Sequence, residues 1–231
     1  MFKIETHMHT NHISGCSRID AASLAEGYQK AGFAAVTVTD HYCRDTFPPL
    51  GIDITVPGQD AIGAFLEGFR RVEAECAPRG IKVYKGAELR FDECVNDYLL
   101  FNYPDELLAD PAKIFPLGIA GFAPLAREAG ALLIQAHPYR KPCTPAIACY
   151  LDGVEVCNRN PHHGARNRNH LAEEYASDFH LLRLGGSDCH GAEQIGTGGI
   201  IAEELPEDDA AFAELIRSGR YTIIGAETPG R

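Results

Sequence analysis

Short apolar runs alternate with amphipathic stretches along most of the chain. The runs at 33–39, 81–88 and 131–136 are rich in aliphatic residues and have the length of buried strands. The stretches between such runs carry apolar residues at helical spacing and end at glycine or proline. Helices are expected at 19–31, 59–77, 104–109, 118–129, 162–176 and 208–218, and further strands at 98–101, 154–156, 181–186, 198–202 and 221–224.

The alternation of strands and helices indicates the fold class. A strand, a helix and a second strand in succession are typical of parallel pairing, because parallel neighbours need a long crossover. The chain contains no internal repeat, low-complexity tract or linker-like stretch. We therefore expect an α/β fold, in which residues 1–231 form a single barrel-like domain with a parallel core. In such barrels the chemistry lies at the carboxyl ends of the strands.

The first strand candidate runs into two histidines separated by one residue. In an extended strand residues i and i+2 point to the same face, so His7 and His9 project together. Two neutral imidazoles on one face are suited to a metal ion. The pattern alone is weak, since surface strands also carry it by chance, and the rest of the chain must strengthen it.

Residues of ligand type stand at the ends of other predicted strands as well. Each has a structural alternative: His41 in a helix cap, Glu88 in a surface ion pair, Asp188 in an Asx turn. Their recurrence at one end of the predicted barrel favours a metal site, and Glu88 could bridge two ions. The candidate metal ligands are His7, His9, His41, Glu88, His137, Asp188 and His190, with Glu88, Asp40 and Asp188 as candidate catalytic carboxylates. The set predicts about two to three divalent ions, either zinc, manganese or iron.

Composition narrows the possible partners and compartment. The net charge of −11 argues against a general nucleic-acid partner and leaves at most a short nucleotide. No apolar run approaches the roughly 20 residues that span a bilayer, and no signal peptide is recognised, so we expect a cytoplasmic protein without a membrane partner. The eight cysteines form no CxxC pair, which favours reduced thiols. The oligomeric state is left open.

Five short motifs, in order along nearly the whole chain, resemble those of the polymerase-and-histidinol-phosphatase (PHP) family of metal-dependent hydrolases. They are His7-Met8-His9-Thr10, Thr39-Asp40-His41, Gly86-Ala87-Glu88, Ala136-His137-Pro138 and Ser187-Asp188-Cys189-His190. The resemblance implies a distorted (β/α)7 TIM-like barrel that holds up to three ions and hydrolyses phosphoesters. It also implies that His7, His9, Glu88 and Asp188 hold one ion, that His41 and His190 help to hold a second, and that Glu88 and His137 hold a third or the bridging partner.

The chain departs from the family pattern at two places. The family has an Asp or His about five residues after the second motif histidine, where this chain has Ser14, and His12 is the candidate replacement. The family also has a histidine between the glutamate and the His-Pro motif, where only Asn102 is available here. Asn158 is a further candidate, for orienting a ligand histidine from outside the ligand set.

A phosphate substrate needs cationic side chains beside the metals, and arginine binds phosphate bidentately. The candidates are Arg90, Arg140, Arg44 and Arg166, of which Arg90 and Arg140 follow presumed ligands most closely. The function expected is a phosphoesterase that acts on a small phosphate ester through metal-activated hydroxide. Two alternatives stay open: a metal-dependent amidohydrolase, and a catalytically silent metal-binding regulatory PHP module.

Overall fold

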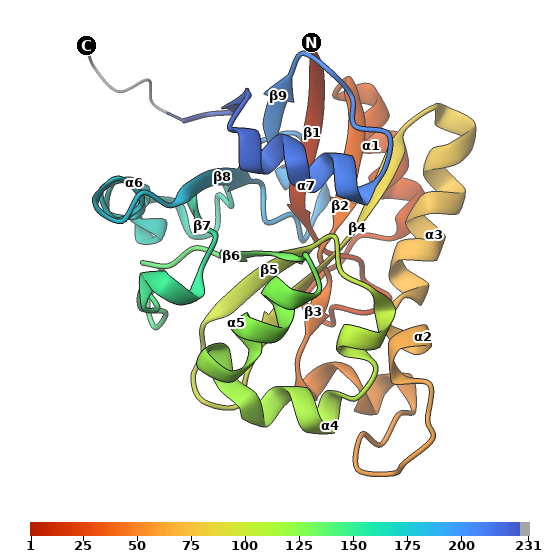
Figure 1. Ribbon diagram of the computed structural model, residues 1–231. Helices are drawn as coiled ribbons and strands as arrows, with labels where there is room; N and C mark the ends of the chain where they lie inside the picture. The colour runs from red at the N-terminus through yellow and green to blue at the C-terminus, as the bar shows by residue number, and fades with distance from the viewer. Residues whose placement is uncertain (227–231) are drawn as a thin grey trace.

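The computed structural model describes residues 1–226, and its core is a mixed β-sheet rolled into a nearly closed barrel (Figure 1). The strands pair in the order β10-β9-β1-β2-β4-β5-β6-β7-β8, with β3 on β4. The barrel closes where Met8 forms a parallel bridge with Cys189, just past β8. The strands are β1 (Phe2–Met8), β2 (Phe33–Val38), β3 (His41–Tyr42), β4 (Lys82–Arg90), β5 (Asp97–Phe101), β6 (Leu132–Gln135), β7 (Gly153–Asn158), β8 (Leu182–Gly186), β9 (Ile200–Ala202) and β10 (Tyr221–Ile223).

The core is not parallel throughout. β5 runs antiparallel to both β4 and β6, and β9 runs antiparallel to β1 and β10. Residues 91–96, which join β4 to β5, are too few for the crossover that a parallel pair requires. As a consequence, β5 begins at the end of the barrel where the parallel strands finish. The α/β barrel class is confirmed, whereas the expected parallel core is interrupted at β5 and β9 and holds for β1–β2–β4, β3–β4 and β6–β7–β8.

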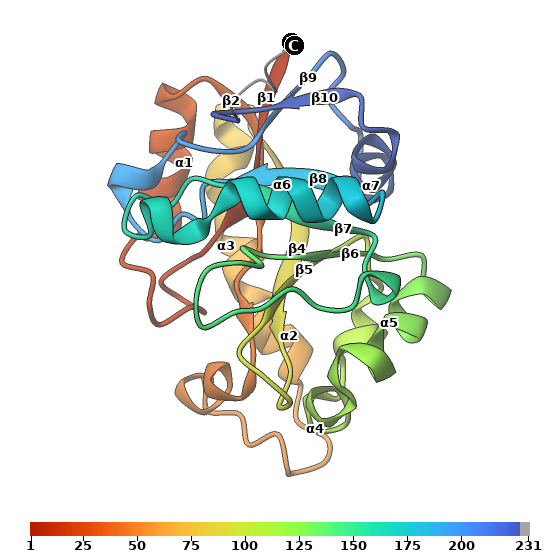
Figure 2. The same cartoon turned by 90° about the vertical axis from the view of Figure 1, so that its left-hand side faces the viewer.

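Helices cover the outside of the barrel and one of its ends. α1 and α3 lie side by side, α6 crosses β7 and β8, and α7 packs on β4 and β8 (Figures 1 and 2). Phe212 of α7 stacks on Tyr84 near the start of β4 and shares a cluster with Ile4 and Leu132, so α7 closes the amino-terminal end. The helices are α1 (Ala21–Lys30), α2 (Ala61–Phe65), α3 (Glu67–Cys76), α4 (Pro111–Ile114), α5 (Gly118–Glu128), α6 (Asn169–Asp178) and α7 (Asp209–Ser218).

Several predicted helices are shorter than the hydrophobic pattern indicated. The helix expected over 59–77 is divided at Leu66 into α2 and α3, and glycines at 63 and 68 lower helix propensity around this point. The helix expected over 162–176 starts only at Asn169, after Arg168 adopts a left-handed conformation. The segment expected as a helix at 104–109 is a 3-10 turn over Asp105–Leu108. Among the described residues, no helix has the length and apolar character needed to cross a bilayer.

Candidate metal centre

A register irregularity in β1 turns His7 and His9 toward the barrel interior. Ile4 packs in the cluster with α7, whereas Met8 packs against α1 and α3, although strict alternation would put both on one face. The pairing of β1 with β2 shifts between Glu5 and Met8, as at a β-bulge. The Glu5 carboxylate accepts hydrogen bonds from the backbone N–H groups of Thr6 and His7, at 3.0 and 3.1 Å. After the bulge, the residues that would have pointed outward point into the barrel instead. His7 and His9 therefore face the barrel interior.

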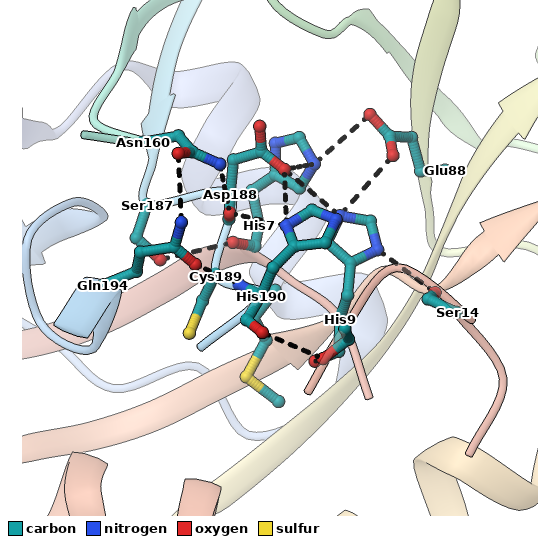
Figure 3. Close-up of polar contacts among 12 residues, drawn as sticks. His7, His9, Ser14, Glu88, Asn160, Ser187, Asp188, Cys189, His190 and Gln194 are labelled. Atoms are coloured by element: carbon teal, nitrogen blue, oxygen red, sulfur yellow. Dashed lines mark hydrogen bonds and ion pairs between the residues drawn. The ribbon is translucent and has the colours of Figure 1, made fainter. Parts of the chain in front are cut away.

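Glu88 lies at the centre of the predicted ligands. Its Oε1 is 3.1 Å from His137 Nε2 and 3.3 Å from His7 Nε2. Its Oε2 is 2.8 Å from His41 Nδ1 and 3.5 Å from His9 Nε2 (Figure 3 shows Glu88 facing His7 and His9). A single carboxylate thus contacts four imidazoles, two on each oxygen, which is the arrangement that a bridging ligand needs.

Asp188 faces the same cluster from the end of β8. Its Oδ1 lies 3.5 Å from His7 Nε2, 3.3 Å from His9 Nε2 and 3.4 Å from His190 Nδ1. The residue has a φ of 52°, in the left-handed region that aspartate tolerates better than most residues. The seven predicted ligands therefore converge at one end of the barrel, although their role as metal ligands stays a prediction.

Hydrogen bonds on the far side of four rings orient them toward the centre. His7 Nδ1 donates to Glu155 Oε1 at 3.0 Å, and His190 Nδ1 donates to the Asp188 carbonyl at 2.9 Å. His9 Nδ1 lies 3.3 Å from Ser14 Oγ, and His137 Nδ1 lies 3.9 Å from Cys143 Sγ. This network assigns the proton of each ring to Nδ1 and leaves Nε2 for a ligand.

Buried polar atoms at the centre match a cation. His7 Nε2 and His9 Nε2 are fully buried and form no hydrogen bond with any residue of 1–226, and the Glu88 and Asp188 carboxylate oxygens lie 3.3–3.5 Å from them. Unsatisfied buried polar groups are rare, because each loses its hydration without compensation. Nitrogen and carboxylate ligands in this geometry suit zinc, iron or manganese. The residues present therefore fit divalent ions.

Charge pairing sets the protonation of the cluster. Burial raises the pKa of Glu88, but the positive charges of His7 and His41 outweigh it and hold that pKa well below its usual value. Burial lowers the pKa of His7, but the charges of Glu155 and Asp188 outweigh it and raise that pKa well above its usual value. His9 differs, because burial and the charges of His190 and His41 all lower its pKa. Without a cation, imidazolium groups neutralise the buried carboxylates.

The predicted arginines do not share one location. Arg140 Nη1 is 2.6 Å from Asp188 Oδ2 and its side chain is only 14% exposed. Arg90 is held by Asp97 through two hydrogen bonds of 2.8 Å. Arg44 pairs instead with Asp92 and lines a cavity of about 420 Å³ together with the 47–54 loop. Arg166 is exposed. Arg140 is therefore the arginine that reaches the cluster directly.

Three predicted site residues point elsewhere. His12 does not replace Ser14: it lines a separate cavity of about 300 Å³ with Arg71 and Asp20. Asn102 lies at the opposite end of the barrel, because β5 is antiparallel, and donates to the Gly130 carbonyl. Asp40 accepts hydrogen bonds from Thr10 and Ser14, so it holds the 10–14 loop rather than facing the centre.

Sequence reasoning missed Asp97 and Glu155. Asp97 opens β5 and its Oδ2 lies 3.9 Å from His137 Nε2, where the reversed strand presents its first residue to the cluster. Glu155 is buried between Val154 and Val156. A charged residue inside an apolar strand is the feature of the sequence that could have indicated a functional role for Glu155. Asn158, which was predicted, donates to Glu155 at 2.9 Å and to Asp188 at 3.3 Å.

Comparisons with known proteins identify relatives of this fold. A family model described as PHP-associated matches residues 166–221, a stretch that includes Asp188 and His190. No curated protein matches the chain. A two-domain protein from Bacteroides vulgatus, which contains a predicted PHP-like metal-dependent phosphoesterase, is 17% identical with a TM-score of 0.66. That match covers 96% of this chain and 64% of the other, so this chain spans less than two thirds of its relative.

Two further structures share the fold with other described activities. An amidohydrolase from Chromobacterium violaceum is 15% identical with a TM-score of 0.56, and the match covers 95% of this chain and 97% of the other. A lesion-specific endonuclease from Pyrococcus furiosus is 14% identical with a TM-score of 0.56, covering 96% and 57%. The endonuclease means that nucleic acid is not excluded as a partner of this fold. The chain is thus similar to the PHP-associated family over residues 166–221, and it shares the fold of these solved structures.

Proposed function

We propose that the chain is a metal-dependent hydrolase, and more specifically a phosphoesterase that acts on a small phosphate ester. The observation that carries this proposal is the environment of Glu88, whose two oxygens lie 2.8–3.5 Å from four imidazoles. The buried Nε2 atoms of His7 and His9, which form no hydrogen bond, add to it. Carboxylate-bridged ions of this kind clamp the oxygens of a group undergoing hydrolysis.

The proposed ligand sets are those that the family resemblance implies. We assign His7, His9, Glu88 and Asp188 to one ion, His41 and His190 to a second, and Glu88 with His137 to a third or to the bridging position. When bound, divalent ions supply Lewis acidity and a hydroxide nucleophile at neutral pH. The chain holds the Nδ1 protons of His7, His9, His137 and His190 away from the centre, so that Nε2 is available. Zinc, manganese and iron all accept this set of donors.

Arg140 supports a phosphate substrate rather than a carbonyl one. Its guanidinium is mostly buried beside Asp188, where it can donate to a phosphate oxygen next to the ions. The charges of Asp188 and Glu88 raise its pKa against the effect of burial, so it stays protonated. Developing negative charge on the phosphoryl oxygens gains most from such a fixed donor. An amidohydrolase, which shares this fold, has less need of that cation and is the second candidate.

The test is a substrate panel with purified protein. Protein stripped with a chelator and reloaded with zinc or manganese is assayed on phosphate monoesters, phosphate diesters, a nucleotide and simple amides. We expect phosphate release that depends on added metal and falls by at least about 100-fold in Glu88→Gln, since that variant removes the bridging charge. Arg44→Ala, whose side chain pairs with Asp92 outside the cluster, is the matched control and is expected to retain activity.

Two results would overturn the proposal. Hydrolysis of amides without hydrolysis of phosphate esters would assign the chain to the amidohydrolases. Metal-loaded protein that is inert on the whole panel would assign it to the silent regulatory modules.

A further inference from the structure

Asp97 is a second buried carboxylate beside Glu88. It is the first residue of β5, and because β5 runs antiparallel to β4, this first residue lies at the end of the barrel where the cluster is. The sheet register pairs Asp97 with Arg90, two residues beyond Glu88 on β4. The Asp97 side chain is only 3% exposed. A charged group buried to this degree requires compensating partners.

The distances around Asp97 are those of a ligand. Its Oδ2 lies 3.9 Å from His137 Nε2, and Glu88 Oε1 lies 3.1 Å from the same nitrogen. Asp97 also forms a group with His41 and Glu88, in which one possible ligand atom from each lies within 4.8 Å of the others. Donors that share one ion at about 2.1 Å stand roughly 3–4 Å apart. The contacts of His137 Nε2 with both carboxylates already have this spacing.

Two carboxylates in this arrangement call for a cation between them. Glu88 and Asp97 are both buried, and an oxygen of one lies within 4.8 Å of an oxygen of the other, so their negative charges repel. Arg90 compensates Asp97 from one side, through hydrogen bonds of 2.8 Å to each oxygen. A carboxylate oxygen has two acceptor positions, so Arg90 leaves one on each oxygen for a further partner.

Cys143 is the other candidate ligand near His137. Asp97, His137 and Cys143 each offer an atom within 4.8 Å of the others. The Cys143 thiol, however, contacts the opposite ring nitrogen, Nδ1, at 3.9 Å, and donates to the Val95 carbonyl at 3.5 Å. His137 Nε2 is the nitrogen that approaches Glu88 and Asp97. The two carboxylates, rather than the thiol, are therefore the partners of His137 around an ion.

We propose that Asp97 is a metal ligand, and that it completes with Glu88 and His137 a position of three protein ligands. The inference rests on the proposed function, because it requires that the cluster bind metal. Glu88 and His137 alone supply one ligand fewer than the three typical of catalytic zinc sites, in which the fourth position is open to water. Two carboxylates and one imidazole are harder donors than the pair His41 and His190, so this position favours manganese more strongly than theirs does.

Counting bound manganese tests the ligand. Chelator-stripped full-length protein is titrated with Mn²⁺, and the paramagnetic resonance signal of free Mn²⁺ gives the number of ions bound. We expect Asp97→Asn to bind about one ion fewer per chain than the wild type, because an amide keeps the shape of the side chain but removes its charge. Arg90→Gln is the matched control: it removes the partner of Asp97 and leaves the carboxylate, so it should keep the wild-type count.

A second measurement does not depend on how well a variant folds. Crystals of the wild-type protein grown with manganese are analysed by anomalous scattering, which locates each ion. We expect a peak within about 2.5 Å of a carboxylate oxygen of Asp97.

Three results would overturn this inference and leave the proposed function intact. They are an unchanged count in Asp97→Asn, equal losses in Asp97→Asn and Arg90→Gln, and crystals in which the bound ions do not touch Asp97. Equal losses would mean that Asp97 acts only through its ion pair with Arg90. Wild-type protein that binds no metal would overturn both the inference and the proposed function.

Discussion

Glu155 is a buried carboxylate that connects three parts of the site. Its Oε1 accepts from His7 Nδ1, and its Oε2 accepts from the His137 N–H at 3.0 Å and from Asn158 at 2.9 Å. A carboxylate partner on the outer nitrogen of a metal-ligating histidine fixes the tautomer and raises the basicity of the ligand. Glu155 is therefore placed as a positioning residue for His7.

Replacement of Glu155 by glutamine tests this role. The amide oxygen would satisfy the two donors near Oε2, so the amide NH₂ would face His7 Nδ1 and drive the ring proton to Nε2. We expect metal affinity to fall by about 10–100-fold while the fold is retained. Metal titration followed by competition with a chromophoric chelator measures the change. Glu173→Gln, on the exposed face of α6, is the control, and equal affinities in the two variants would contradict the role.

Arg140 is the cation that we propose to bind the phosphate group of the substrate. Its removal in Arg140→Ala deletes a charged hydrogen-bond donor worth about 1.5–3 kcal/mol, so kcat/KM for a phosphate ester should fall by about 10–100-fold. Arg44→Ala should leave kcat/KM within about twofold, because Arg44 pairs with an exposed aspartate. Steady-state kinetics of both variants on a phosphate ester measure the two values of kcat/KM. An unchanged kcat/KM in Arg140→Ala would remove Arg140 from the substrate site.

The convergence of single residues could be predicted where they follow a parallel strand. His41, Glu88, His137, Asp188 and His190 converge because such strands all finish at one end of the barrel. Asp97 was missed and Asn102 was misplaced for the same reason, since a reversed strand exchanges its two ends. The direction of β5 depends on how short the connection from β4 is. The hydrophobic pattern within β5 carries no information about that direction.

At the scale of elements, α3 sets the position of the 10–18 loop. Gly68 faces this loop so closely that a Cβ added there would lie 2.5 Å from Asp40 Oδ2 and 2.7 Å from Ile13 Cγ1. The Asp40 side chain cannot move aside easily, because its carboxylate accepts hydrogen bonds from the Thr10 N–H at 2.7 Å and from Ser14 Oγ at 2.7 Å. The helix and the loop that approaches His41 are therefore packed as one unit.

Gly68→Ala should destabilise the protein, although alanine is the better helix former. Overpacking at such a contact costs about 1–3 kcal/mol, against about 1 kcal/mol gained in helix propensity. Chemical denaturation of Gly68→Ala measures the difference in unfolding free energy. Gly15→Ala is the control in the same loop, because a Cβ there would meet nothing within 4 Å. Equal or greater stability of Gly68→Ala would show that the loop is not packed this way.

Element boundaries were less predictable than element types. Periodicity indicated one helix over 59–77, but the close packing of Gly68 on the 10–18 loop is a tertiary contact that no local pattern contains. The inward direction of His7 and His9 likewise depends on the β1 bulge and on the Glu5 hydrogen bonds that support it. Spacing alone placed both histidines on one face without saying which face.

At the scale of the whole molecule, the cluster couples metal binding to proton release. Burial lowers the pKa of His137, but hydrogen bonds with Cys143 and Glu88 outweigh it and raise that pKa to about 9. His7 and His41 also have raised pKa values, each against the effect of burial. A histidine must be neutral to bind metal, so these protons leave when an ion enters.

Metal affinity should therefore rise with pH through the region of about pH 9 in which His137 loses its proton, with more protons released per ion at about pH 7 than above pH 9. Calorimetry in buffers of different ionisation enthalpy counts the released protons. If the number of released protons does not change between these pH values, the ion does not displace the protons of His137, His7 and His41.

If the converging histidines and carboxylates form one multinuclear metal centre, the purified protein should contain several metal ions per chain, which elemental analysis measures. We expect about two to three bound divalent ions per chain in the wild type, and a loss of at least about one ion in Glu88→Gln. Fewer than one ion per wild-type chain after exposure to zinc or manganese would contradict it.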